Sequence, residues 1–304
     1  MIQVENLTRK YGDFTAVDNV SFSIPRGQVV GLLGHNGAGK TTIMKVLTGF
    51  LEPTAGKVTI AGLNLETHRL EAQAKIGYLP EHSPLYPEMS VVEYLAYVCQ
   101  LRSIPAEKRQ EAISRALDRT ALKDRAFDKI YTLSKGYRQR VGVAQAILHK
   151  PEILIMDEAT SGLDPAQIQV MRTLILELCK DAAVILSTHI MQEVEAVCGR
   201  VLIISQGKLV ADAQLEDLRN SQRVVVDVDQ DAGVVAPVLR SIDGVEVAEC
   251  VRESIGSRLF LQCGERAEAL IPEIARKVVE QGWRLRQIGR EQRSLETVFR
   301  EVSR

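Results

Sequence analysis

The segment from Gly34 to Thr41 constrains the fold of this chain more than any other part of the sequence. It reads GHNGAGKT, matches the pattern G-x-x-x-x-G-K-[ST] in full, and directly follows an apolar run at residues 28–33. The pattern belongs between a buried strand and a helix, because the backbone N–H groups of the loop then face a phosphate. We therefore predict a strand over 28–33, a helix over 40–48 and a bound nucleotide between them.

The whole loop contributes to this predicted phosphate site. Its glycines let the backbone approach the phosphates at close range. We expect Lys40 to neutralise the β- and γ-phosphates and the Thr41 hydroxyl to ligate Mg²⁺. Thr42 either touches the α-phosphate or serves only the start of the helix. The predicted nucleotide-binding residues of the loop are Gly34, His35, Asn36, Gly37, Ala38, Gly39, Lys40, Thr41 and Thr42.

Two carboxylates follow a second apolar run, at residues 153–156. Asp157 ends the predicted strand, so we expect its carboxylate at the sheet edge beside the loop, where it helps to hold Mg²⁺. Glu158 points elsewhere, and a carboxylate there can polarise a water for in-line attack on the γ-phosphate. The alternative is a solvated glutamate at a strand end. The pair predicts ATP hydrolysis.

Strands alternate with helices along the rest of the first part of the chain. Apolar runs at 183–187 and 201–205 predict further strands, and apolar residues recur at helical spacing between about 88 and 150. This alternation predicts an α/β fold with a parallel-containing sheet and a helical insertion. We place the first domain at residues 1–218.

Residues 222–304 form a second predicted unit. The patterns there occur in the order strand, helix, strand, strand, helix, strand, which is typical of a small α+β ferredoxin-like domain. A last helix, over 294–302, is expected to pack against an apolar surface.

Composition excludes several classes of protein. The 304 residues carry a formal net charge of −1, which does not indicate nucleic-acid binding. The five cysteines include no C-x-x-C pair, as expected in a reducing compartment. We see no export signal, and no apolar run approaches the ~20 residues of a membrane helix. If the protein works at a membrane, another chain spans it.

The peptide LSKGY at residues 133–137 predicts a dimer. Its Ser and Gly suit a helix N-terminus that offers backbone N–H groups to an anion. The phosphate loop needs no second site of this kind from its own chain. A second copy of the protein does need one, to close over the nucleotide.

Together, these features resemble the ATP-binding subunits of ABC transporters, over about residues 1–218. The peptide at 133–137 resembles the signature peptide, usually LSGGQ, with Lys135 and Tyr137 in place of Gly and Gln. The segment SGLD, which ends at Asp164, resembles the D-loop, and His189 resembles the switch histidine that touches the γ-phosphate.

Two further positions carry the resemblance. Tyr11 resembles the aromatic residue that stacks on adenine, and the alternative is an ordinary strand aromatic. Glu81 stands where the family has its Q-loop glutamine and still offers an oxygen to Mg²⁺ or water. By this resemblance the fold is that of an ABC-type P-loop NTPase, with a mixed sheet, an antiparallel β subdomain and a helical insertion.

The resemblance also implies partners, a location and a mechanism. Two copies face head to tail, and each ATP lies between the phosphate loop of one copy and Ser134 and Gly136 of the other. Asp164 crosses this interface, and Glu158 and His189 act in hydrolysis. A separate multi-span permease docks near residues 81–88, so the chain is peripheral, at the cytoplasmic face of the cell membrane. The unit at 222–304 resembles the accessory domain of ABC-2 and gliding-motility-type exporters.

Two other functions stay open. ABC-type ATPases of DNA repair, chromosome organisation and translation usually carry coiled-coil insertions or two ATPase domains, and this chain has one phosphate loop and no heptad run. A regulatory or mechanical switch on a membrane complex without transport is the second alternative. Glu158 and His189 favour hydrolysis, whereas Glu81 leaves the switch open.

Overall fold

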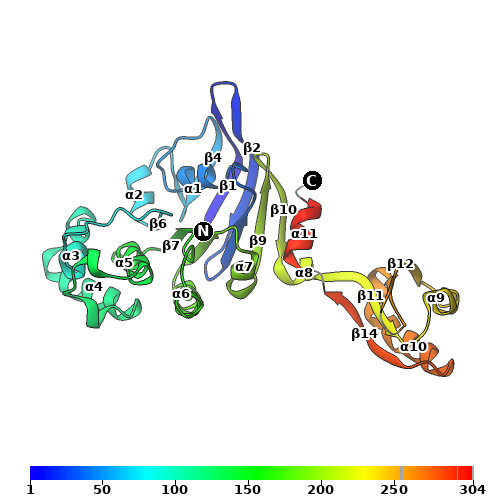
Figure 1. Cartoon of the computed structure of the whole chain (residues 1–304). Coiled ribbons are helices and arrows are strands. Elements are labelled where there is room, and N and C mark those ends of the chain that lie inside the picture. The colour runs from blue at the N-terminus through cyan, green and yellow to red at the C-terminus, as the bar shows by residue number, and fades with distance from the viewer. Residues whose placement is uncertain (254–255, 293, 303–304) are drawn as a thin grey trace. The chain divides into compact units, whose positions relative to one another are not determined.

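The computed structural model describes residues 1–253, 256–292 and 294–302. They form two compact units, the first made of Met1–Leu215 with Phe299–Arg304 and the second of Glu216–Val298. The division lies inside the short helix α8 (Leu215–Arg219), close to the predicted domain boundary. The residues from Phe299 on differ from the prediction, because they group with the first unit. Figure 1 follows the chain from blue to red.

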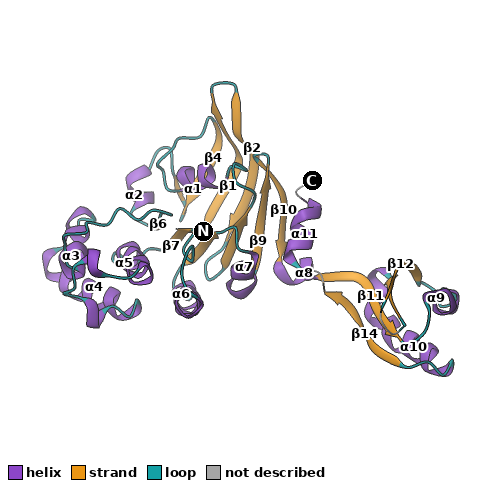
Figure 2. Ribbon diagram, in the orientation of Figure 1, coloured by secondary structure: helices purple, strands orange, loops and turns teal. Residues whose placement is uncertain are grey.

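A six-stranded mixed sheet forms the centre of the first unit (Figure 2). Its strand order is β10-β9-β3-β8-β7-β6, with all neighbours parallel except β9 and β10. The strands are β3 (Val29–Leu33), β6 (Ile76–Leu79), β7 (Ile153–Asp157), β8 (Ala183–Ser187), β9 (Arg200–Ser205) and β10 (Lys208–Gln214). Strands β3, β7 and β8 are buried along their whole length, which explains why continuous apolar runs predicted them.

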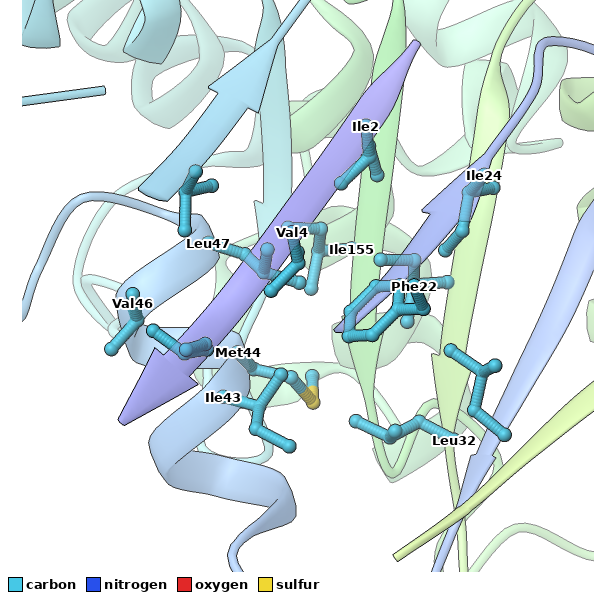
Figure 3. Packing of buried hydrophobic residues seen from close by; sticks show 14 of the residues in the cluster. Ile2, Val4, Phe22, Ile24, Leu32, Ile43, Met44, Val46, Leu47 and Ile155 are labelled. Atoms are coloured by element: carbon cyan, nitrogen blue, oxygen red, sulfur yellow. The ribbon is translucent and has the colours of Figure 1, made fainter. Parts of the chain in front are cut away.

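An antiparallel sheet of order β2-β1-β4-β5 packs against the helix α1 (Lys40–Leu47) and one face of the central sheet. Its strands are β1 (Ile2–Tyr11), β2 (Phe14–Ile24), β4 (Ala55–Ile60) and β5 (Leu63–Asn64). Figure 3 shows Val4 and Phe22 from this sheet, Met44 from α1, and Leu32 and Ile155 from the central sheet in one cluster. This shared core fixes the start of α1 relative to the ends of β3 and β7.

Helices complete the first unit. The predicted helical insertion contains α3 (Val91–Leu101), α4 (Ala106–Arg119) and α5 (Lys135–Ile147). A capping box between Ser90 and Glu93 fixes the start of α3. The remaining helices are α2 (Arg69–Gln73), α6 (Pro165–Cys179) and α7 (Met191–Val197).

The second unit is a four-stranded antiparallel sheet of order β12-β13-β11-β14. Its elements follow the predicted order: β11 (Asn220–Val228), α9 (Ala232–Leu239), β12 (Glu246–Arg252), β13 (Ser257–Gln262), α10 (Ala267–Glu280) and β14 (Leu285–Gln292). Alternate valines of β11 are buried with Leu259 and Leu261 of β13 and with the apolar side of α10. The last helix, α11 (Leu295–Val302), follows β14.

Candidate nucleotide-binding site

Close approaches of the backbone require glycine at both ends of the phosphate loop. The loop joins β3 to α1, as predicted. Gly39 precedes α1 with φ 108°, and a Cβ on it would lie 2.5 Å from the Ala16 carbonyl oxygen. A Cβ on Gly34 would lie 2.5 Å from the Ile204 carbonyl oxygen. Larger residues at either position would displace the loop from the sheet edge.

Lys40 folds back onto this loop. Its ammonium donates hydrogen bonds to the carbonyl oxygens of Gly34, at 2.6 Å, and His35, at 3.1 Å. Burial lowers the pKa of Lys40, and the negative charges of Glu158 and Asp157 oppose that shift. An anion would stabilise this buried ammonium more than the neutral carbonyl groups do, because it compensates the positive charge. The loop therefore holds a cation ready for a phosphate.

The Thr41 hydroxyl is exposed at the start of α1, and Thr42 is half-buried. Neither hydroxyl has a hydrogen-bond partner within the described ranges of the chain. Both hydroxyl oxygens are therefore able to bind a ligand. The alternative that Thr42 serves only the start of the helix has no hydrogen bond to support it.

Asp157 ends β7 with its side chain buried. Burial raises the pKa of Asp157, and the charges of Glu158 and Glu81 act in the same direction. The charges of two other carboxylates therefore act on Asp157, which also lies near the charge of Lys40. A divalent cation would relieve this repulsion.

Glu158 and His189 meet although they lie 31 residues apart in the sequence. Nδ1 of His189 lies 3.0 and 2.9 Å from the two carboxylate oxygens of Glu158. Glu158 has a left-handed backbone with φ 52°, and its N–H donates to the Ser187 carbonyl oxygen at 2.9 Å. Left-handed backbone in a non-glycine residue costs free energy and concentrates at functional sites. The two residues predicted to act in hydrolysis therefore form one unit at the ends of β7 and β8.

Glu81 follows β6 and is exposed, and its charge reaches both Asp157 and Tyr78. Burial, helped by the charges of Asp157 and Glu81, raises the pKa of Tyr78 to about 12. In the part of the chain that is described, no three His, Cys, Asp or Glu side chains gather as a metal site. Asp157 and the Thr41 hydroxyl could supply the few protein oxygens that Mg²⁺ takes when it keeps several waters and binds phosphate oxygens.

Ser134 begins the signature helix α5. Its hydroxyl accepts a hydrogen bond from the Tyr137 N–H at 3.4 Å, and the residue is exposed. Tyr137 is held between two guanidinium groups, those of Arg125 at 5.4 Å and Arg140 at 5.0 Å from its ring centre. The start of α5 thus presents Ser134 outward while the unusual Tyr137 is anchored in the same chain.

Gly136 packs against its own chain. It is buried, and a Cβ on it would lie 2.5 Å from Oε1 and 2.8 Å from Nε2 of Gln167. Gln167 belongs to α6, whose start is capped by Asp164 through a 2.9 Å hydrogen bond from the Gln167 N–H. The D-loop and the signature peptide therefore touch through Gln167. No sequence pattern marks this residue, because the contact joins segments 31 residues apart.

Tyr11 is the last residue of β1, at the turn of the β1–β2 hairpin. It is 43% exposed, and the Arg9 guanidinium covers one face of its ring at 4.7 Å. The same hairpin carries Ala16, whose carbonyl approaches Gly39. The exposed ring is available for stacking from its other face.

Known proteins are similar to this chain in sequence and in fold. The family described as ABC transporter matches residues 17–161. YdbJ of Bacillus subtilis strain 168, an uncharacterized ABC transporter ATP-binding protein, is 32% identical and covers 98% of this chain and 94% of its own length. The Nod factor export ATP-binding protein I of Ralstonia nicotianae is 34% identical, over 86% of this chain and 80% of its own. A solved ATP-binding subunit of an ABC transporter has a TM-score of 0.66 and 30% identity, and covers 72% of this chain and 92% of its own.

The fold and the loop define a P-loop nucleotide-binding ATPase cassette. The chain belongs to the ABC transporter family, as an ATP-binding subunit. Within the described ranges, no helix combines the length and apolarity that a membrane crossing requires.

Proposed function

We propose that this chain binds and hydrolyses ATP to energise export through a separate multi-span permease, by closing and opening a dimer with a second copy of itself. The contact between Glu158 and His189 beside the phosphate loop carries the proposal. The name of the Nod factor export relative supports export as the direction.

In the proposed reaction, ATP phosphates replace the carbonyls of Gly34 and His35 as partners of the Lys40 ammonium. The Thr41 hydroxyl and Asp157 would hold Mg²⁺, with Glu81 as a further oxygen donor. When bound, Mg²⁺ neutralises charge on the β- and γ-phosphate oxygens.

Glu158 accepts a hydrogen bond from the attacking water and receives its proton. The ring of His189 orients the carboxylate of Glu158, which it contacts directly. Tyr11 stacks on the adenine from the face that Arg9 leaves open. Each of these groups is positioned by a strand end or a hairpin of one chain.

The partner copy completes the site in this proposal. Ser134 is exposed and Gly136 places backbone N–H groups in the first turn of α5, so both are suited to the γ-phosphate of the facing copy. Asp164, which caps α6 in its own chain, would lie at the same interface with the partner copy. ATP then joins the two copies, and hydrolysis releases them.

We further propose that residues 81–88 dock the permease, which makes the chain peripheral at the cytoplasmic face of the membrane. Tyr86 is 49% exposed and forms an aromatic cluster with Tyr94 and Tyr97, at 6.2 and 5.5 Å between ring centres. Exposed aromatic residues are common at protein interfaces. The element and strand order of the second unit supports its assignment as a ferredoxin-like accessory domain.

Affinity purification from detergent-solubilised membranes tests the coupling. We expect the tagged chain to recover a multi-span protein, and Tyr86→Ala to lose it while phosphate release by the isolated subunit stays unchanged. Glu107→Ala, an exposed change on α4, is the control. Recovery of the tagged chain without a membrane protein would contradict both the transport role and a switch on a membrane complex.

A further inference from the structure

The ring of Phe299 stands against the phosphate loop. It meets the imidazole of His35 edge to face, with 4.9 Å between ring centres and 61° between ring planes. Phe299 is 7% exposed and belongs, with the residues after it, to the first unit. Edge-to-face pairs of this geometry stabilise beyond the area they bury.

His35 connects this contact to the lysine of the loop. Its carbonyl oxygen accepts hydrogen bonds from the Lys40 ammonium and from the Ala38 N–H, both at 3.1 Å. The same residue therefore meets Phe299 through its ring and the phosphate-binding groups through its backbone. His35 is an exposed residue, and its imidazole packs against the ring of Phe299.

We propose that Phe299 is a positioning residue for ATP binding, which braces the phosphate loop through the His35 ring. The C-terminal turn of α11 thereby preorganises the loop before nucleotide arrives. The proposal rests on the proposed function in one respect, namely that this loop holds the phosphates of ATP.

Titration with the fluorescent analogue TNP-ATP, with the full-length chain, tests this role. Because an aromatic pair of this kind is worth a modest free energy, we expect Phe299→Ala to raise the Kd about two- to tenfold. Phe299→Tyr should restore most of the affinity, and Val298→Ala, a buried neighbour on the same helix, should leave the Kd unchanged. Phosphate release at saturating ATP should change little.

A double-mutant cycle shows whether Phe299 acts through His35. In a His35→Ala background, Phe299→Ala should cost no further affinity. Hydrogen exchange without nucleotide gives a second measurement. The amides of residues 34–40 should exchange faster in Phe299→Ala than in the wild type, and at the wild-type rate in Val298→Ala.

Lys40→Ala separates this inference from the proposed function. If Lys40→Ala abolishes TNP-ATP binding while Phe299→Ala leaves both the Kd and the exchange of the loop unchanged, the brace is wrong and the phosphate site stands. If Lys40→Ala binds as the wild type does, the loop is not the nucleotide site and both proposals fail.

Discussion

Substituting alanine for Gly136 tests whether the glycine of the signature peptide is required by its own chain. The added Cβ would lie 2.5 Å from Oε1 and 2.8 Å from Nε2 of Gln167. Real carbon atoms do not approach so closely, so the Gln167 side chain must move. Overpacking of this kind costs about 1–3 kcal/mol, and a movable amide places the cost near the lower end.

We therefore expect Gly136→Ala to lower the free energy of unfolding by about 1 kcal/mol and to reduce ATP hydrolysis. Gln167→Ala removes the clashing atoms. The double variant should recover both stability and hydrolysis, with a coupling energy of about 0.5–1.5 kcal/mol. Urea unfolding and phosphate release measure the two quantities. Gly199→Ala, with no neighbouring atom within 4 Å of its Cβ, is the matched control.

One outcome would refute this reasoning. If the double variant regains its stability and stays inactive, the loss of hydrolysis does not come from the packing of position 136 against Gln167. If Gly136→Ala and Gly199→Ala have the same free energy of unfolding, the packing of Gly136 against Gln167 does not contribute to stability.

Two further predictions concern the carboxylates. Glu158→Gln should reduce phosphate release by about 10²- to 10⁴-fold and retain TNP-ATP binding, because only the proton acceptor is lost; substantial residual turnover would contradict its role. Asp157→Asn should raise the melting temperature of the nucleotide-free protein at pH 7. Folding raises the pKa of Asp157, so stability falls as pH rises from the ordinary value of 3.8 and the carboxylate ionises. This increase in melting temperature should disappear below about pH 3, where Asp157 is protonated in the folded and the unfolded protein alike. Equal melting temperatures of the variant and the wild type at pH 7 would contradict the prediction.

The sequence placed most of the proposed site residues at strand ends, because local patterns mark those strands. Apolar runs located β3, β7 and β8, and parallel strands necessarily bring their carboxyl ends to one edge. Asp157 and Lys40 follow directly from this arrangement. The family resemblance gave Glu158 and His189 roles in hydrolysis, but their contact with each other was not predicted.

Contacts between distant segments had no such pattern. Gln167 reads as an ordinary residue of an amphipathic helix, and its packing on Gly136 depends on how α5 and α6 lie in space. Phe299 was expected to pack on an apolar surface, but the sequence did not indicate His35.

The central claim is that each ATP is hydrolysed between two copies of the chain, and complementation tests it most directly. Ser134→Arg removes the proposed contact of Ser134 with the ATP of the partner copy. Lys40→Ala removes the lysine with which the phosphate loop binds the ATP of its own copy. A mixed dimer has one intact site if the sites are shared between copies, and none if each chain works alone.

The two variants should each be nearly inactive, and an equimolar mixture should recover up to about one quarter of wild-type phosphate release, since half of randomly formed dimers are mixed with one good site of two. Mixing Ser134→Arg with Glu158→Gln gives the same expectation from a second pair. A mixture no more active than the sum of its separate components would contradict the shared site.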